Sequence, residues 1–225
     1  LDAWTQTGTP TPTQNAVGTD GAANTAWTLT DNDVTATEFI SRADLKTIAG
    51  VRDTYSIYVK KTAGVQTNFP AIIYSNSAGT HYAGANIDTT NGVVNDWATR
   101  TGATLVESGS SIVSHNSDYW RVSLTYLAQT TELTAVVQAV PAFRNVFGTN
   151  GDAIVATTGS AVFQNLQVEY GTVATRYQAI TTATSFDEVG FLPYIELDGT
   201  GHLDVATGGG GSAGPYAAWS TPAGI

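Results

Sequence analysis

The sequence predicts an all-β protein whose main domain is an antiparallel jelly-roll β-sandwich. Short segments alternate apolar and polar residues with a period of two, which is typical of half-buried strands. Turn signals rich in Gly, Asn and Asp recur every ~8–12 residues, a spacing that favours an antiparallel sandwich over alternating βαβ units. Only residues 44–51 allow a short helix, which Gly50 would end. We expect the sandwich to span residues 20–181.

Three segments carry the clearest strand pattern. In residues 55–61 (YSIYVKK), Ile57 faces one side, and Tyr58 faces the other. Residues 119–127 (YWRVSLTYL) repeat the pattern, and residues 161–170 (AVFQNLQVEY) form the strand that closes the domain. Further strands are expected at 71–75, 82–87, 93–97, 103–107 and 133–140. Residues 108–117 are rich in Ser and Gly and are predicted to be a polar loop.

The two flanks of the sandwich have a different composition. Residues 1–19 contain TPTPT at positions 9–13, so they are expected to form an extended arm, because proline and the residue before it disfavour helix. Residues 182–225 are expected to be a linker and a hairpin. The hairpin signal is DGTG at 198–201, and GGGG at 208–211 is expected to be flexible.

Composition excludes several classes of function. The 225 residues include 19 Asp and Glu but only 9 Lys and Arg, for a net charge of −10. Phosphate backbones and anionic lipid would repel such a chain, so neither nucleic acid nor a membrane surface is an expected partner. No apolar run is long enough for a transmembrane helix. With no cysteine, disulfides and thiolate metal sites are excluded.

Four segments, in their order and spacing, resemble a known family. They are YSIYVKK at 55–61, IDTTNGVV at 87–94, the pair ATLVES and DYWRVSLTY within 103–126, and LQVEYGTVATRYQAIT at 166–181. Together they resemble the carbohydrate-binding-module-like, concanavalin-like jelly-roll domains of bacteriophage tail and capsid-fibre proteins. The matching positions are Tyr58, Lys60, Asp88, Gly92, Val94, Trp120, Arg121, Ser123, Gln167, Glu169, Gly171, Thr175, Tyr177 and Thr181. The chain departs from the family at Gln164, where a Trp is frequent, and at Ile180, where a Pro is usual. Residues 194–205 (YIELDGTGHLDV) resemble the opening strands of a second lectin-like module.

The resemblance implies a phage fibre or decoration protein on the virion surface that attaches to the host. Its partners would be host surface polysaccharide and other virion proteins. The family also implies a homo-oligomer, for which a trimer is a common form among fibre proteins. An alternative of a different class is a purely structural assembly module that packs only against other virion chains. Gln164 in place of an aromatic residue, and the Thr/Pro arm, favour this alternative.

A sugar site on such a sandwich needs aromatic faces for stacking and planar polar side chains for the hydroxyl groups. The candidate carbohydrate-binding residues are Tyr58, Tyr74, Tyr82, Trp97, Arg121 and Gln167. Each tyrosine can equally be a core or cross-strand residue, and Trp120 is assigned to the core. Gln167 and Glu169 can instead form a polar network that ties the closing strand to a loop, with Arg121 or Arg176 as the partner of Glu169.

Catalysis is not expected. Glycoside hydrolysis needs two carboxyl groups across a cleft, whereas most acidic residues here lie in predicted turns. The sequence contains no E-x-D-x-E run, no G-x-S-x-G elbow and no P-loop. His81, His115 and His202 lack metal-ligand spacing. No cofactor is expected. The fold class allows a structural calcium ion, but the sequence identifies no ligands for it, so the metal ligands stay unknown.

Overall fold

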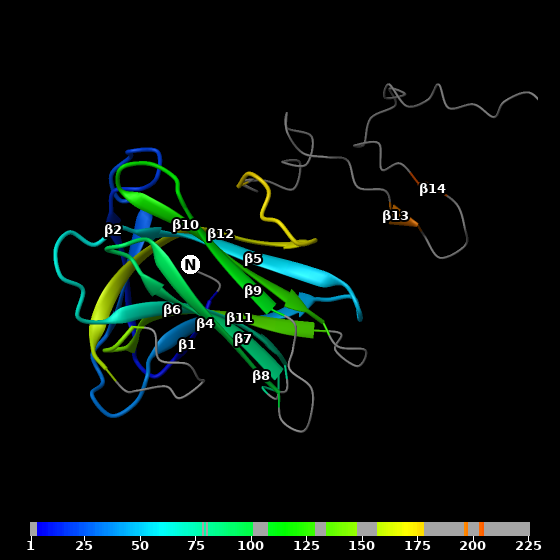
Figure 1. Cartoon of the computed structure of the whole chain (residues 1–225), viewed down its shortest axis with the longest axis horizontal. Coiled ribbons are helices and arrows are strands. Elements are labelled where there is room, and N and C mark those ends of the chain that lie inside the picture. The colour runs from blue at the N-terminus through cyan, green and yellow to red at the C-terminus, as the bar shows by residue number, and fades with distance from the viewer. Residues whose placement is uncertain are drawn as a thin grey trace, which may run out of the picture. The chain divides into compact units, whose positions relative to one another are not determined.

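The computed structural model describes residues 4–77, 79, 81–100, 108–128, 134–147 and 157–177, together with 196–197 and 203–204. The chain divides into two compact units, Leu1–Tyr177 and Gln178–Ile225. In the first unit, two antiparallel six-stranded sheets pack face to face (Figure 1). The described residues contain no helix. The predicted antiparallel β-sandwich is therefore confirmed.

The first sheet has the strand order β1-β4-β11-β6-β7-β8. Its strands are β1 (Thr5–Thr7), β4 (Phe39–Lys46), β6 (Phe69–Asn76), β7 (His81–Asp88), β8 (Val93–Arg100) and β11 (Thr134–Arg144). The second sheet has the order β2-β3-β12-β5-β10-β9. Its strands are β2 (Thr11–Ala16), β3 (Ala26–Asp31), β5 (Arg52–Lys60), β9 (Ser108–Ser114), β10 (Tyr119–Leu127) and β12 (Gly159–Tyr170). Because the chain passes repeatedly between the sheets, residues distant in sequence become neighbours across each face.

The core lies between the two sheets and is built from alternate positions of their strands. Strand side chains point to opposite faces in turn, so one side of each strand is apolar. The buried inward-facing residues include Leu29, Tyr55, Ile57, Ile72, Tyr74, Val122, Leu124, Tyr126 and Phe163. The rings of Tyr74 and Tyr126 stack across the core, with centroids 4.5 Å apart. The closing strand β12 lies inside the second sheet, between β3 and β5.

Three sequence-based expectations differ from the structure. Residues 44–51 are not helical: they contain the end of β4 and a turn in which Gly50 has a φ of 76°. The first 19 residues are extended, but β1 pairs with β4 and β2 pairs with β3, so both are edge strands of the sandwich. Residues 108–114, expected in a loop, form the edge strand β9, which pairs with β10 from Ser114 to Ser108. Pairing with a strong neighbouring strand overrides the weak strand preference of Ser and Gly.

In the second unit, β13 (Glu196–Leu197) and β14 (Leu203–Asp204) pair antiparallel. They flank DGTG at 198–201, so the predicted hairpin is confirmed. The expected linker at 208–211 and the strand at 103–107 lie outside the described residues. In the part of the chain that the structure describes, no helix could cross a membrane.

Candidate functional site

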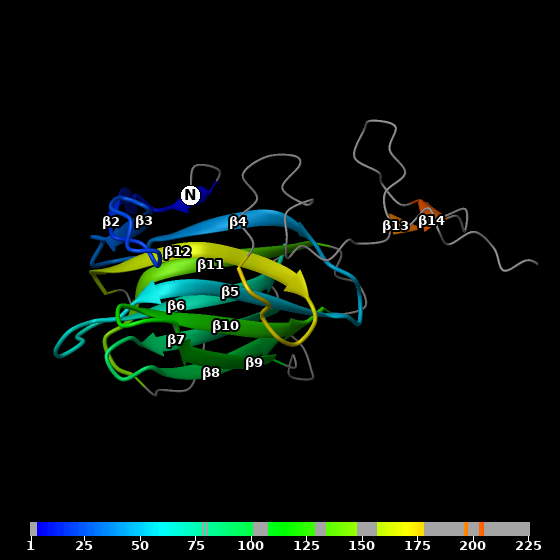
Figure 2. The same cartoon turned by 90° about the horizontal axis from the view of Figure 1, so that it is seen from above.

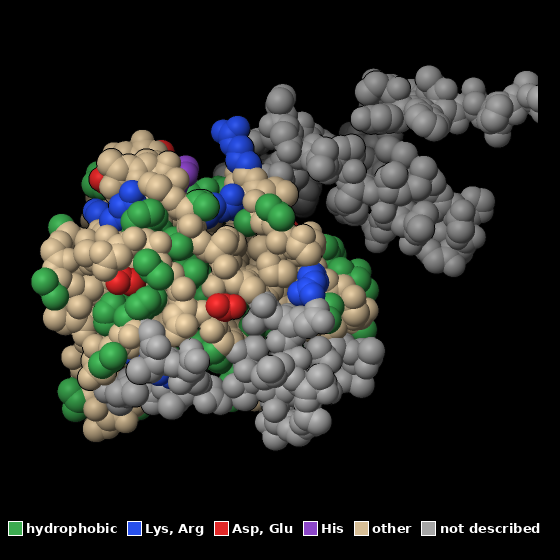
Figure 3. Space-filling view, in the orientation of Figure 1, with side chains coloured by type: hydrophobic (Ala, Val, Ile, Leu, Met, Phe, Trp, Pro, Cys, Tyr) green, Lys and Arg blue, Asp and Glu red, His purple; other side chains and the backbone are tan. Residues whose placement is uncertain are grey.

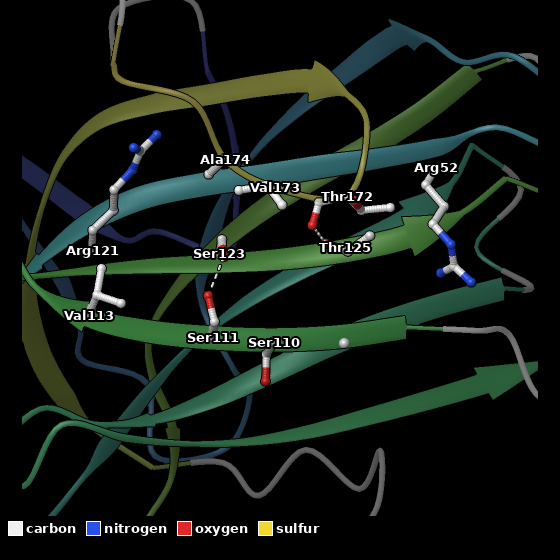
Figure 4. A pocket seen from close by; sticks show the side chains of 11 residues that line it. Arg52, Ser110, Ser111, Val113, Arg121, Ser123, Thr125, Thr172, Val173 and Ala174 are labelled. Atoms are coloured by element: carbon white, nitrogen blue, oxygen red, sulfur yellow. Dashed lines mark hydrogen bonds between the residues drawn. The ribbon is translucent and has the colours of Figure 1, made fainter.

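An open groove of about 590 Å³ lies on the outer face of the second sheet (Figure 4). Its floor comes from β9 and β10, and one side is closed by the segment that follows β12. The described lining residues are Arg52, Gly109, Ser110, Ser111, Val113, Arg121, Ser123, Thr125, Thr172, Val173 and Ala174. Hydroxyl groups and two guanidinium groups therefore supply the polar atoms of the groove.

The alternation of β10 builds the floor of the groove. Val122, Leu124 and Tyr126 face the core, which sends Arg121, Ser123 and Thr125 to the outer face. Register then places Ser123 opposite Ser111 of β9 and Ser56 of β5. The hydroxyl oxygens of Ser111 and Ser123 lie 2.7 Å apart. The floor is thus a row of small hydroxylated side chains across neighbouring strands.

Residues 171–177, which we call the wall, form the side of the groove. They leave the end of β12 and cross back over β5 and β10 (Figure 2). The reversal begins at Gly171, whose φ of 119° lies in a region that residues with a Cβ rarely adopt. The Gly171 N–H donates to the Arg52 carbonyl at 2.7 Å, and the Thr54 hydroxyl donates to the Gly171 carbonyl at 2.8 Å. Further along, the Thr125 hydroxyl donates to the Thr172 carbonyl at 3.4 Å.

The residues that carry the family resemblance at the end of the sandwich hold this wall in place. The carboxylate of Glu169 accepts hydrogen bonds from the backbone N–H of Thr175 at 2.7 Å and from its hydroxyl at 2.6 Å. The Gln167 amide donates to the same hydroxyl at 3.2 Å. The ring of Tyr177 packs edge-on against Tyr58, with centroids 6.5 Å apart. The expected polar network between the closing strand and a loop is therefore present, with Thr175 as the partner of Glu169 in place of Arg121 or Arg176.

Arg121 is fixed at one end of the groove, and Arg52 lies at the other (Figure 4). The Arg121 Nη2 donates to the Ser56 hydroxyl at 2.9 Å. Its guanidinium carbon lies 5.5 Å from the centroid of the Tyr58 ring, a cation–π arrangement. Its Nε is buried and has no hydrogen-bond partner among the described residues. These contacts orient the guanidinium before any ligand binds.

Tyr58, Arg121 and Gln167, three of the six predicted site residues, lie on the outer face of the second sheet. Tyr58 is opposite Arg121 and Gln164 in register, and Gln167 is opposite Ser56. Arg121 lines the groove. Tyr58 is only 5% exposed because His115 and Tyr177 pack on its ring, so it offers no open stacking surface.

Tyr74, Tyr82 and Trp97, the other three, belong to the first sheet. Tyr74 is fully buried, and its hydroxyl donates to Oδ2 of Asp53 at 2.6 Å. Burial raises the pKa of Asp53 more than this hydrogen bond lowers it. Tyr82 and Trp97 lie on the outer face of the first sheet, with ring centroids 5.9 Å apart. The six residues thus occupy three separate places.

The sequence reasoning missed Arg52, the small residues of β9 and the wall residues Thr172–Ala174. The only available signal for β9 was a weak alternation in residues 108–114, close to the strong strand at 119–127. The Ser and Gly content of these residues hid it. The sequence signal for the wall is the 167–177 motif. The family resemblance identified this motif but did not indicate that it borders a groove.

Trp120, Asp31 at the end of β3 and Glu38 just before β4 serve the fold. The Trp120 indole N–H donates to the Thr89 carbonyl at 2.8 Å, and its ring covers Gly92. Asp31 and Glu38 are each 1% exposed, and Oδ2 of Asp31 accepts from the Glu38 N–H at 2.9 Å. Burial raises the pKa of Asp31, while hydrogen bonds from Asn32 and Thr9 lower the pKa of Glu38 despite its burial. Within the described residues, no group of three or more His, Asp or Glu side chains could hold a metal ion.

Comparison with known proteins found a similarity among solved structures. No protein-family model matches the sequence, and no curated protein matches it. Among solved structures, the chain is similar to the crystal structure of the enzymatically active domain of tailspike protein 4 from bacteriophage CBA120, with a TM-score of 0.40 and 12% identity. The match covers 74% of this chain but only 19% of that one. A likeness this distant carries no argument about the function of this chain.

Proposed function

We propose that the sandwich binds host surface carbohydrate in the groove, as part of a phage virion fibre or decoration protein. The observation that carries the proposal is the open 590 Å³ groove with its hydroxyl-rich floor. Ligand sites are concave and use a few well-placed polar groups to fix orientation. A groove of this kind on a sandwich suits an extended polymer better than a compact metabolite.

The groove recognises sugar by hydrogen bonds in this proposal. The hydroxyl groups of Ser111, Ser123 and Thr125 can each donate and accept, which matches the hydroxyl groups of a pyranose. The described lining contains no aromatic side chain, so ring stacking is not the main contact. Gln164, where the family frequently has a Trp, is bound within the fold: its amide oxygen accepts from the Thr19 N–H at 2.6 Å.

The virion setting rests on the sequence resemblance. The residues matching the family at 167–177 either belong to the wall or hold it in place, which links the resemblance to the candidate site. On this proposal the partners are host polysaccharide and other virion chains, the location is the virion surface, and the protein is a homo-oligomer.

We also propose that the groove binds without hydrolysing. Glycoside hydrolysis uses a pair of carboxyl groups placed across the scissile bond. Among its described lining residues the groove has no carboxyl group. Incubation of purified protein with any polysaccharide it binds should therefore release no new reducing ends.

The proposed function is tested by filling the groove. Gly109 lines the groove with a strand conformation, and a Cβ there meets nothing within 4 Å, so Gly109→Trp should fold while blocking the floor. Glycan-array and microscale titration should show that the wild-type protein binds a host-type polysaccharide and that Gly109→Trp loses at least about tenfold in affinity, or ~1.4 kcal/mol.

Thr13→Trp is the matched control. Thr13 is exposed on β2 of the same sheet and does not line the groove, so this variant should bind as the wild type does. The proposal is wrong if the wild-type protein binds no glycan on the array, or if both tryptophan variants bind it as well as the wild type.

Virion assembly is the second candidate function. Val113 and Val173 border the groove and are 57% and 73% exposed, so another chain could bury them. In that case the wild-type protein would bind no polysaccharide, and Val113→Ser with Val173→Ser would lower its incorporation into particles, measured by quantitative mass spectrometry of purified virions.

A further inference from the structure

The charge of the groove is opposite to the charge of the chain. The chain carries 19 acidic and 9 basic side chains, and Figure 3 shows few charged side chains on the face it presents. The described lining of the groove nevertheless contains two arginines and no acidic residue. An excess of cationic groups in a cleft raises the local concentration of anions, and here it does so on a protein that otherwise repels them.

Arg121 is prepared to bind an anion. Its Nη2 is held by Ser56 and its plane lies over Tyr58, while its buried Nε has no hydrogen-bond partner among the described residues. The guanidinium carries five N–H donors, and a carboxylate or sulfate oxygen is the strongest acceptor for those that line the groove. Arginine also suits such planar or multi-oxygen anions through its fork of donors.

Arg52 is a second cationic residue, at the end of the groove opposite Arg121. Arg52 and Tyr58 lie six positions apart on β5, and Arg121 is opposite Tyr58. At about 3.3 Å per residue, the two arginines originate ~20 Å apart along the strand direction. Figure 4 shows them at opposite ends of the groove with the hydroxyl row between them. One sugar ring cannot reach both, whereas an oligosaccharide can.

We propose that the groove selects an acidic polysaccharide, with anionic groups on separate sugar rings held by Arg52 and Arg121 and with the rings between them held by the serine and threonine hydroxyls. This inference rests on the proposed carbohydrate-binding function and adds the charge and the length of the ligand. The ligand is a polymer of several rings bearing carboxylate or sulfate groups.

The experiment compares polymers that differ in charge. Titrations with polygalacturonate (carboxylate), dextran sulfate (sulfate) and dextran (neutral) should give binding to an acidic polymer and at least about tenfold weaker binding to dextran, because hydrogen bonds to charged groups are the strong ones. The carboxylate and sulfate arms identify which anion fits. Oligogalacturonates of increasing length should bind weakly as the dimer and more tightly once they span both arginines.

Arginine variants locate the site. Arg52→Gln and Arg121→Gln should each weaken binding to the acidic polymer by at least about tenfold. Arg42→Gln removes the same charge from an exposed position on β4 of the other sheet, and should change affinity by less than about twofold if the site is local. Because Arg121 contacts Ser56 and Tyr58, its variant is checked for an unchanged thermal midpoint, and Arg52→Gln provides an independent test.

The outcomes separate this inference from the proposed function. Equal binding of dextran and the acidic polymers, with no effect of either arginine substitution but a loss in Gly109→Trp, would overturn the acidic selectivity and leave carbohydrate binding intact. Equal losses in all three arginine variants would also overturn it, since the effect would then be one of net charge. Failure to bind all three polymers would overturn the acidic selectivity, and failure to bind any glycan on the array as well would overturn both.

Discussion

The two outer faces of the sandwich use their side chains differently. The outer face of the second sheet is hydroxylated, carries the groove and has its large rings Tyr58 and Tyr119 buried. The outer face of the first sheet carries an aromatic cluster of Tyr82, Trp97 and Phe143, in which Trp97 and Phe143 stack with centroids 5.7 Å apart and planes inclined by 10°. The aromatic residues of these two outer faces therefore pack against the fold, and small polar residues line the groove.

The position of Trp97 shows why its ring is not free to stack on a sugar. A Cβ added at Gly84 would lie 2.2 Å from the Trp97 ring, so the indole lies directly on the backbone of β7. One side of the ring is used by Gly84 and another by Phe143. Aromatic side chains on the two faces therefore mark where the fold is stabilised, whereas the hydroxyl row and the two arginines mark the groove.

Removal of a ring from the aromatic cluster of the first sheet should have the largest effect on stability. Phe143 is fully buried, so Phe143→Ala should lower the free energy of unfolding by ~3–5 kcal/mol, as large-to-small core substitutions do. Polysaccharide affinity, measured at a temperature where the variant is folded, should stay within about twofold of the wild type. Denaturant unfolding provides the measurement, and Val173→Ala, at a residue 73% exposed, should change stability by less than about 0.5 kcal/mol.

A smaller effect is expected at the wall, on the groove side. Thr175→Val removes the hydroxyl that donates to Glu169 and accepts from Gln167. The free energy of unfolding should fall by ~1 kcal/mol, the usual net value of such a hydrogen bond, and affinity should fall by about fivefold as the wall loosens. Thr175→Ser keeps the hydroxyl and should restore both. A Thr175→Val protein with unchanged affinity would show that the wall takes no part in binding.

The strands were predictable wherever one face of a strand is buried. Residues 55–60, 119–127 and 161–170 alternate because the core takes every second side chain, and the DGTG signal identified the hairpin at 196–204. The edge strand β9 was missed because an exposed edge paired with a strong neighbour can be built from Ser and Gly. The short helix that residues 44–51 would allow does not form, because pairing of β4 with β11 outweighs a local preference.

The site was less predictable than the fold, since it depends on which strands lie side by side. Arg121 was identified as a candidate, but its hydrogen-bond partner Ser56 and the other lining residues Ser111 and Arg52 come from strands that only long-range pairing brings together. Local pattern also gives no measure of exposure: Tyr58 occupies an outward position and is still covered by His115 and Tyr177. The roles of individual aromatic residues were therefore left open by the sequence.

The smallest expected effect concerns the interior that the two faces share. Asp53 lies on β5, beneath the groove, and is 1% exposed; its carboxyl accepts from Tyr74 of the first sheet. Burial raises its pKa above the ordinary 3.8, so the folded protein binds this proton more tightly than the unfolded chain does. The stability contributed by the protonated form is complete below 3.8 and is lost as the pH rises through the higher folded-state pKa.

Asp53→Asn removes this titration, so the variant should gain stability relative to the wild type as the pH is raised from 3.8 toward neutrality. Because Asp31 and Glu38 titrate in both proteins, the difference between the two stability curves reports Asp53 alone. Urea unfolding at a series of pH values measures it, and a difference that stays flat or falls with pH would contradict the raised pKa. Affinity for polysaccharide should be the same in both proteins, because the carboxyl faces the core while the groove lies on the opposite side of the sheet.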